Sequence, residues 1–396
     1  MNEPVRVALI GANGHGTWHR RELAARHETG RVRVVGLCDV NPIETAADAP
    51  VPDGAALFAD HREMLAATRP DVVVICTPPH THLTLAGDVA RAGCDLLLEK
   101  PPVLSLAEHR ELTRILATTG RACQVGFQAL GSAALARLCD AVRSGRLGTV
   151  SGVSAAASWQ RSDAYYARSP WAGRRRLNGR PVLDGALANP LAHAVMQCLA
   201  VAEVAGGPLV ISTIELERYR TRPIEVDDTA CLRVRLESGV SVVVAVTLCG
   251  EEFIAGEVAA HGRAGRAVLE YPTDRLALPG EAEPTEVPGR VSLLDNLLDH
   301  RASGGEVPLI APLTRTEPFT ALIELIANAP SPTPITDEWT SVSGAAPDRH
   351  TVIRGVNDAV RRAADDLALF SELGVGWATA PHRPMELLQT KGGVTG

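Results

Sequence analysis

The sequence is poor in aromatic residues and long apolar runs, and it has no excess of positive charge. Aromatic residues make up 4% of the 396 residues. The longest apolar stretches, such as residues 240–249, have the length of a strand and are too short to cross a bilayer. A net charge of -7 argues against a nucleic-acid-binding surface, which normally carries a basic patch. We therefore expect neither a membrane nor a nucleic acid among the partners.

The eight cysteines form no C-x-x-C pair, and we find no histidine cluster at a metal-binding spacing. In a chain of this length, scattered cysteines are typical of buried thiols in a reducing compartment, not of a disulfide framework. The chain enters its first strand-like run almost at once, without a basic and apolar leader. These absences predict a cytoplasmic protein that holds no metal.

Residues 1–126 alternate strand-like and helix-like segments. The predicted helices cover residues 18–27, 61–68, 82–92 and 106–119. The predicted strands cover residues 5–10, 32–39, 72–76, 95–99 and 123–126. Nearly continuous apolar strands separated by helices indicate a parallel sheet with both faces covered. The fold class is therefore α/β, beginning with a Rossmann-type doubly wound domain.

Residues 127–396 have a different pattern and are predicted to form a substrate-binding α+β domain. A helix at 132–144 precedes a strand at 150–158, and strands then follow one another without helices at 211–219, 229–236, 240–248 and 253–261. Such runs imply a mainly antiparallel sheet, here an open one. The segment 330–347 is predicted as a loop, and a final amphipathic helix over 353–373 as a segment that could pack on either domain. Because open sheets commonly pair, we expect a homodimer or homotetramer.

The turn Gly11-Ala12-Asn13-Gly14-His15-Gly16 follows a strand and opens a helix, as dinucleotide-binding turns do. Its spacing is G-x-x-G-x-G, so a βα turn without a ligand is the alternative. Asp39 ends the second strand, 23 residues after Gly16, where a carboxylate accepts hydrogen bonds from ribose hydroxyls. An aspartate there repels a 2′-phosphate and no arginine follows it, so we predict NAD, with NADP the less favoured cofactor.

Two further polar loops follow strands of the same predicted sheet. Ligands of open α/β sheets bind outside the carboxyl ends of strands, so the loop Thr77-Pro78-Pro79-His80-Thr81-His82 is predicted to flank the cofactor. Its histidines either contact the nicotinamide half or have a capping or surface role. Glu99-Lys100-Pro101 ends the next strand. A lysine there can hold a substrate hydroxyl while a proton leaves, although an isolated lysine is normally solvated surface.

These elements, in this order, resemble the Gfo/Idh/MocA family of sugar and inositol oxidoreductases. The resemblance rests on the glycine turn, Cys38-Asp39-Val40-Asn41-Pro42, Thr77-Pro78-Pro79 with His82, and Glu99-Lys100-Pro101. It continues through the turn at 145–148, Asp184 and the strand entry at 227–230, and so covers about residues 5–270. It implies a Rossmann domain followed by a substrate domain, NAD(P) chemistry on sugars or cyclitols, and a lysine at position 100 that assists proton transfer.

The sequence departs from that family at its acid/base position. Members usually carry an aspartate followed four residues later by a histidine, whereas Asp184 is followed by Ala188 and the nearest histidine is His193. Asn189 and the proline after it are predicted to cap a helix, which places His193 near a helix N-terminus that favours neutral imidazole. His193 is either a relocated base or a core histidine. If it is structural, Lys100 and Asp184 carry the proton chemistry.

Residues 159–176 concentrate aromatic residues and arginines in a chain with few aromatics. Aromatic faces and arginine forks suit a sugar ring, and packing between domains is the alternative. The short basic run at 174–176 is either a solvated loop or part of a site for an anionic or hydroxylated ligand. The predicted substrate-binding residues are Lys100, Trp159, Arg161, Tyr165, Trp171, Arg174, Asn189 and His193.

The leading hypothesis is an NAD-dependent oxidoreductase that transfers a hydride between the nicotinamide and a sugar, sugar derivative or cyclitol. The alternatives are a transient-redox lyase or hydrolase with tightly bound NAD, and a non-catalytic NAD-binding regulator. The predicted catalytic residues are Lys100, Asp184 and His193. The predicted cofactor-binding residues are Gly11, Asn13, Gly14, His15, Gly16, Asp39, Thr77, Pro78, His80, His82, Glu99, Lys100 and Gln128.

Overall fold

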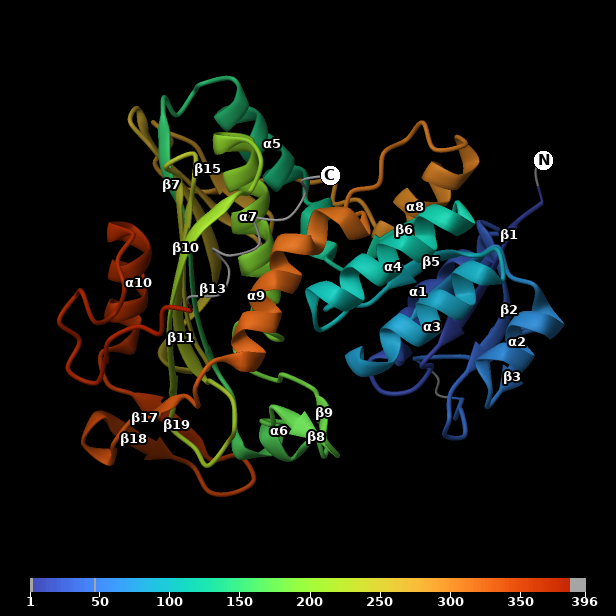
Figure 1. The fold of residues 1–396 in the computed structure, drawn as a ribbon, viewed down its shortest axis with the longest axis horizontal. Helices are drawn as coiled ribbons and strands as arrows, with labels where there is room; N and C mark the ends of the chain where they lie inside the picture. The colour runs from blue at the N-terminus through green and yellow to red at the C-terminus, as the bar shows by residue number, and fades with distance from the viewer. Residues whose placement is uncertain (1–2, 46–47, 385–396) are drawn as a thin grey trace, which may run out of the picture. The chain divides into compact units, whose positions relative to one another are not determined.

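The computed structural model describes residues 3–45 and 48–384. The chain divides into two compact units (Figure 1). The N-terminal unit comprises Met1–Gln128 and Val291–Ala321, and the C-terminal unit comprises Ala129–Arg290 and Leu322–Gly396. Among the described residues, no helix combines the length and the apolar character needed to cross a membrane.

The N-terminal unit contains a six-stranded parallel sheet in the order β3-β2-β1-β4-β5-β6. Its strands are β1 Val5–Ile10, β2 Val32–Cys38, β3 Ala56–Phe58, β4 Val72–Ile75, β5 Asp95–Leu98 and β6 Cys123–Val125. The predicted doubly wound sheet is therefore confirmed. The strand order reverses between β1 and β4, and this switch point is where open α/β sheets bind ligands at the carboxyl ends of their strands.

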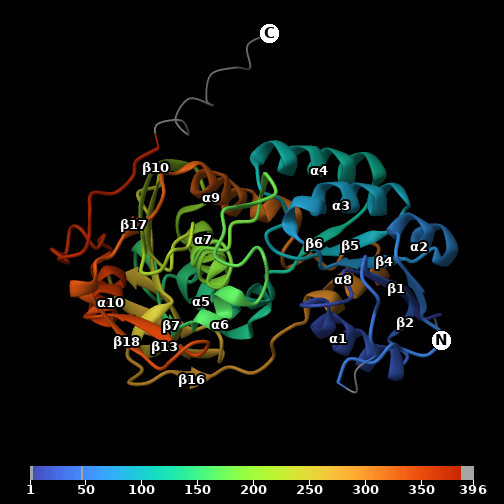
Figure 2. The same cartoon turned by 90° about the horizontal axis from the view of Figure 1, so that it is seen from below.

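Helices cover both faces of this sheet. They are α1 Gly16–Glu28, α2 His61–Thr68, α3 His82–Arg91 and α4 Leu106–Thr119. Figure 2 shows α3 and α4 on one side of the strands and α1 on the other. The helix starts follow local capping rules, because Asp60 accepts from the backbone N–H of Glu63 and Ser105 from that of Glu108.

The segment 291–321 groups with the N-terminal unit, although the sequence analysis assigned it to the second domain. Its helix α8 Leu293–Ala302 contacts β5 and β6. The buried Gln124 side chain donates to Asn296 Oδ1 at 2.6 Å, and the Val125 N–H donates to the Ala311 carbonyl at 2.8 Å. Arg301 adds ion pairs to two carboxylates at the strand starts. The segment thus supplies the partners that the β6 edge needs.

The C-terminal unit is built on a nine-stranded sheet in the order β16-β15-β14-β13-β7-β12-β11-β10-β17. Its strands are β7 Val150–Gln160, β10 Ile211–Arg220, β11 Thr229–Leu236, β12 Ser241–Thr247, β13 Cys249–Gly262, β14 Gly265–Glu270, β15 Arg275–Ala277, β16 Thr285–Glu286 and β17 Thr333–Pro334. Most neighbours are antiparallel, but β7 pairs with β12, and β10 with β17, in parallel. The predicted mainly antiparallel sheet is confirmed.

Both faces of this sheet carry helices. Helix α7 Ala192–Gly206 contacts β7, β12 and β13, and α5 Ala133–Arg143 packs against α7. On the opposite face lies α10 Val356–Asp366, which contacts β7, β12 and β13 (Figure 1). Tyr219, Phe370 and Trp377 pack with the apolar side of α10 in one buried cluster. Part of the face that we expected a second subunit to cover is therefore covered by the chain itself.

The predictions for the last part of the chain need correction. The helix expected over 353–373 is shorter, because Leu367 adopts a left-handed conformation directly after α10. The predicted loop over 330–347 contains β17 and also β18 Thr340–Ser343, which pairs with β19 His350–Ile353. The remaining elements are α6 Asp163–Ala167, β8 Arg176–Leu177, β9 Arg180–Pro181, α9 Glu317–Asn328 and the short 3-10 helices η1 Pro79–Thr81, η2 Gln128–Gly131, η3 Leu313–Thr316 and η4 Asp337–Trp339.

Candidate functional site

The glycine turn between β1 and α1 uses its three glycines for different purposes. A Cβ on Gly11 would lie 2.2 Å from the Cys76 carbonyl oxygen, and one on Gly16 would lie 1.8 Å from the Gly11 carbonyl oxygen. Both are therefore required by the packing of the turn itself. Gly14 has φ +55°, and apart from its two chain neighbours no heavy atom of the described residues lies within 4 Å of its Cβ position. The turn thus leaves open space in front of Gly14, at the start of α1.

The structure explains the irregular spacing of this turn. Gly11 and Gly16 stand at the first and third positions of G-x-G-x-x-G, and Asn13 stands at the second. The Asn13 N–H donates to Asp39 Oδ2 at 2.9 Å. Asp39 also accepts from the Asn41 N–H through Oδ1 at 3.0 Å. Since a carboxylate offers about four acceptor positions, Asp39 retains the capacity to accept from a vicinal diol.

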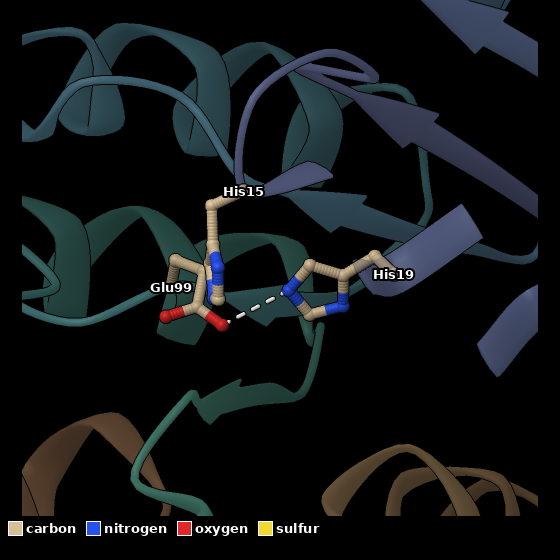
Figure 3. A group of neighbouring side chains, drawn as sticks. All are labelled: His15, His19 and Glu99. Carbon is tan, nitrogen blue, oxygen red and sulfur yellow. Dashed lines mark hydrogen bonds and ion pairs between the residues drawn. The ribbon is translucent and has the colours of Figure 1, made fainter. Parts of the chain in front are cut away.

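Glu99, at the end of β5, is a buried carboxylate, and Figure 3 shows its hydrogen bond with the His19 ring. It accepts from His19 Nε2 at 2.9 Å, from the Lys100 N–H at 3.0 Å and from Gln128 Nε2 at 3.1 Å. Burial raises the pKa of Glu99, but the His19 hydrogen bond and the charges of His19, His15 and Lys100 outweigh it and bring that pKa down to about 2. Glu99 is therefore an ionised anchor, and Lys100 follows it directly.

His15 lies beside the same carboxylate, and its imidazole approaches His19 and Glu99 (Figure 3). One ligand atom from each of the three side chains lies within 4.8 Å of the other two. Burial lowers the pKa of His15, while the charge of Glu99 opposes that shift. This group was not predicted from the sequence, although the spacing of His15 and His19 was a signal for it, because residues four apart share one helix face.

The loop after β4 is held in place by His82, which is completely buried. Its Nε2 faces the Thr77 carbonyl at 2.8 Å, and its Nδ1 faces the Pro101 carbonyl at 3.0 Å. Burial lowers the pKa of His82, and the hydrogen bonds to these carbonyls oppose that shift. These contacts favour a structural role for His82 over direct contact with a ligand. His80 is partly buried and is the second residue of η1.

In the C-terminal unit, Asp184 is buried and accepts four hydrogen bonds. Arg168 Nη2 donates to its two oxygens at 2.8 and 2.9 Å, the Gly173 N–H at 2.9 Å and Asn189 Nδ2 at 2.7 Å. The prediction that Asn189 caps the next helix is wrong, because Asp184 engages its side chain and α7 begins at Ala192. His193 is the second residue of α7 and is partly buried.

Four of the predicted substrate residues, Trp159, Arg161, Tyr165 and Trp171, form one stack of arginines and aromatic rings together with Arg168. The Arg161 guanidinium lies 4.9 Å from the Trp159 ring centroid and 5.1 Å from that of Tyr165. Arg168 lies 3.7 Å from the Tyr165 centroid and 4.6 Å from that of Trp171. The sequence analysis missed Arg168, whose signal was its position three residues after Tyr165. Arg168 connects this stack to the buried Asp184.

Arg174 lies outside the stack and faces Glu225, with Nη1 3.3 Å from Oε1. It borders a hollow of about 380 Å³ whose walls include Asp163, Tyr166, Arg222 and Glu225. Arg222 donates to Asp163 Oδ1 at 3.4 Å, so this hollow presents paired charges and an aromatic face. Such a lining suits a polar, hydroxylated ligand.

Comparison with known proteins agrees with this architecture. Residues 5–127 match the family described as "Oxidoreductase family, NAD-binding Rossmann fold", and residues 135–268 match the "GFO/IDH/MocA C-terminal domain". Together the two matches cover more than half of the chain. The chain belongs to the Gfo/Idh/MocA family of oxidoreductases. The resemblance carried by the glycine turn, Asp39 and Glu99-Lys100-Pro101 is thus confirmed, and the family binds NAD(P).

Two similar Gfo/Idh/MocA relatives are bacterial dehydrogenases. Inositol 2-dehydrogenase of Rhizobium meliloti (strain 1021) is 31% identical over 146 residues, which are 37% of this chain and 43% of the relative. D-glucoside 3-dehydrogenase of Escherichia coli (strain K12) is 28% identical over 150 residues, 38% of this chain and 42% of the relative. The matching stretch therefore spans less than half of the length of these relatives.

Solved structures of similar proteins extend over most of the chain. The WlbA dehydrogenase of Bordetella pertussis, in complex with NADH and UDP-GlcNAcA, has a TM-score of 0.67 at 23% identity and covers 82% of this chain and 95% of its own. The aldose-aldose oxidoreductase of Caulobacter crescentus, complexed with glycerol, has a TM-score of 0.65 at 18% identity, with 82% and 96% coverage. At these identities the likeness establishes the shared fold.

Proposed function

We propose that this Gfo/Idh/MocA protein is an NAD-dependent dehydrogenase acting on a hydroxyl group of a sugar, sugar derivative or cyclitol. The observation that carries the proposal is the carboxyl edge of the parallel sheet in the N-terminal unit. There the hydrogen bonds from Asn13 to Asp39 and from His19 to Glu99 tie together the glycine turn and the ends of β2 and β5. This edge combines a place for a dinucleotide with a lysine at the same strand ends.

The residues at this edge fit a dinucleotide. The open space before Gly14 admits a pyrophosphate, and the N-terminus of α1 has no side-chain cap, so its backbone dipoles favour an anion. In this proposal, Asp39 accepts hydrogen bonds from the two hydroxyls of the adenosine ribose. A 2′-phosphate there would meet the Asp39 carboxylate without a neighbouring arginine in Val40-Asn41-Pro42, so we propose NAD as the cofactor.

Lys100 is proposed to take the proton from the reacting hydroxyl. Of the 39 basic residues in the chain, only Lys100 and Lys391 are lysines. Arginine retains its proton at neutral pH, whereas lysine can release one. Nearly all basic residues of this chain are arginines, but the residue after Glu99 is a lysine. We therefore propose that a group able to exchange a proton is needed at this position. The Lys100 backbone N–H donates to Glu99 Oε2 at 3.0 Å, and this hydrogen bond fixes the position of the Lys100 backbone.

The bound dinucleotide would supply a hydride acceptor for the carbinol carbon, and the side chains of the protein handle the proton. Lys100 Nζ accepts the hydroxyl proton as the carbonyl forms. His193 is the second candidate for this acid/base role. We propose that Asp184 acts through position, because its four hydrogen bonds hold Arg168 and Asn189 in place. The stack around Tyr165 then offers aromatic faces and guanidinium donors to a sugar ring.

The decisive experiment measures reduced nicotinamide with NAD and a panel of sugars and cyclitols. Lys100→Met should lower kcat by about 10²–10⁴-fold, the usual contribution of general acid–base catalysis. Lys100→Arg keeps the charge but should lose nearly as much, since arginine does not release a proton. Arg114→Met, on the exposed surface of α4, is the matched control. Full activity of Lys100→Arg would contradict the proton-transfer role.

One observation favours a second candidate function. The residue four positions after Asp184, where family members usually carry a histidine, is the buried Ala188. A transient-redox enzyme would oxidise a sugar carbon, eliminate a neighbouring group and reduce the carbon again. It would form product from the same panel without accumulating reduced nicotinamide. Stabilisation by NAD without turnover of any substrate would instead indicate a non-catalytic regulator.

A further inference from the structure

His15, His19 and Glu99 form a compact group of metal-ligating side chains in the N-terminal unit (Figure 3). His15 precedes the first residue of α1 and His19 lies one turn later, so both project from the same face of the helix. Glu99 reaches them from the end of β5. The three ligand atoms lie within 4.8 Å of one another, and His19 Nε2 is already 2.9 Å from Glu99 Oε1.

This donor set matches one that zinc uses when a coordination position stays open. Two histidines and one glutamate bind Zn²⁺ in several hydrolases, with water as the fourth ligand. With bonds of about 2.0–2.1 Å, tetrahedral ligand atoms lie about 3.4 Å apart. Glu99 and His19 are close to that separation. His15 is exposed and lies on the turn, so it is the ligand that can move to close the site.

The surroundings of Glu99 support it as a ligand. Gln128 Nε2 and the Lys100 N–H both donate to its carboxylate, and partners of this kind orient metal ligands. The N-terminus of α1 and the charge of Lys100 oppose a cation. The helix-end effect is confined to the first turn and is weak, whereas three coordination bonds are strong.

We propose that His15, His19 and Glu99 bind one Zn²⁺ ion in the dinucleotide-free protein, with water completing a tetrahedral site. His15 stands between Gly14 and Gly16, at the place where the proposed function puts the pyrophosphate. Zinc and NAD therefore exclude each other; this last step rests on the proposed function, whereas the zinc site does not.

The test is a titration of the metal-free full-length protein with Zn²⁺ against a chromophoric chelator, without dinucleotide. We expect one site per chain that depends on these residues. His15→Ala should weaken it at least tenfold, by analogy with the roughly 10–100-fold cost of losing even an outer partner. Glu99→Gln should do the same. His61→Ala is the control, because His61 pairs with Asp88 at 2.9 Å in the same unit but belongs to no three-ligand group of the described residues.

X-ray absorption identifies the ligands. A shell of nitrogen and oxygen at about 2.0–2.1 Å supports the site, whereas sulfur at about 2.3 Å would assign the metal to cysteine and overturn it. An unchanged affinity in His15→Ala would overturn it as well, and since His15 is exposed, that variant should fold.

Competition is measured separately, by NAD titration with and without Zn²⁺. In the wild type, Zn²⁺ should raise the apparent Kd for NAD, and in His15→Ala it should not. Simultaneous binding would refute the exclusion. Failure of the metal-free protein to bind NAD would count against the proposed function, while the zinc titration would stand on its own result.

Discussion

The two units each contain a buried carboxylate that accepts several hydrogen bonds, but the donors differ. Glu99 is held by a histidine, a glutamine and a backbone N–H, with a second histidine and a lysine nearby. Asp184 is held by one arginine nitrogen that donates to both of its oxygens, an asparagine and a backbone N–H. Histidine and lysine are residue types that can gain and lose a proton, whereas an arginine guanidinium stays protonated.

The difference in donors suggests different roles for the two carboxylates: a functional role for Glu99 and a structural role for Asp184. The Arg168 guanidinium donates to both Asp184 oxygens and so fixes the loop that carries it. Glu99 instead has two histidines beside it, a residue type that also binds ligands and metals. Burial alone therefore does not identify a functional acid; the identity of the donors does.

The largest expected effect on stability comes from removing the permanent partner. Arg168→Met leaves the Asp184 charge buried without its cation, and breaking such a pair costs about 3 kcal/mol of unfolding free energy. The measurement is denaturant unfolding followed in the C-terminal unit. Arg143→Met is the control, since the Arg143 and Asp140 side chains are 63% and 74% exposed and should change stability by less than about 0.5 kcal/mol. Equal losses of unfolding free energy in Arg168→Met and Arg143→Met would contradict the structural role of the Arg168–Asp184 pair.

The next effect is a pH dependence at Glu99. Its pKa is about 2 in the folded chain against an ordinary value of 4.5, so the folded state favours the ionised form. This group contributes about 3 kcal/mol above pH 4.5, and the contribution is lost as the pH falls from 4.5 towards 2. Glu99→Gln should flatten the stability curve in that window. A curve that keeps its wild-type slope would show that Glu99 is not the titrating group.

The smallest effect concerns His261, in β13 of the C-terminal unit, whose Nε2 lies 2.8 Å from Ser154 Oγ. Burial, with a contribution from the charge of Arg266, lowers the pKa of His261 to about 4 from 6.5. The neutral ring therefore stabilises the fold above pH 6.5. Because the ring is only partly buried and solvent screens it, we expect about 2 kcal/mol to be lost as the pH falls from 6.5 to 4. His261→Gln should remove this slope in acid titrations monitored by circular dichroism. No difference from the wild type between pH 4 and 6.5 would refute the prediction.

Local patterns predicted most of the fold. The apolar strands and the helix at 61–68 were predicted from residues adjacent in the chain, and the structure confirms them. The return of residues 291–321 to the N-terminal unit could not be predicted in this way. The apolar stripe of α8 shows that the helix packs on something, but not on which sheet. Its partners, among them Gln124, lie more than 150 residues away.

The site was predictable only where it depends on backbone shape. Gly11 and Gly16 have no room for a side chain, and this requirement is visible in the sequence. The role of Asn189 was predicted wrongly because a helix cap and a buried carboxylate compete for the same amide, and the sequence does not say which wins. The partners of Glu99 come from elements 80 and 29 residues away, beyond any local pattern. Whether Lys100 and His193 are catalytic remains a prediction.

The division of the N-terminal unit into two stretches of sequence has a consequence for synthesis on the ribosome. Residue 128 is made 193 residues before residue 321, the last of this unit. At about 5–20 residues per second, the unit is completed roughly 10–40 s after its first stretch has been made. During that interval the nascent chain exposes an unfinished sheet while the strands of the other unit emerge. A chaperone that shields the β6 edge would therefore act on the ribosome-bound chain, before the protein is released.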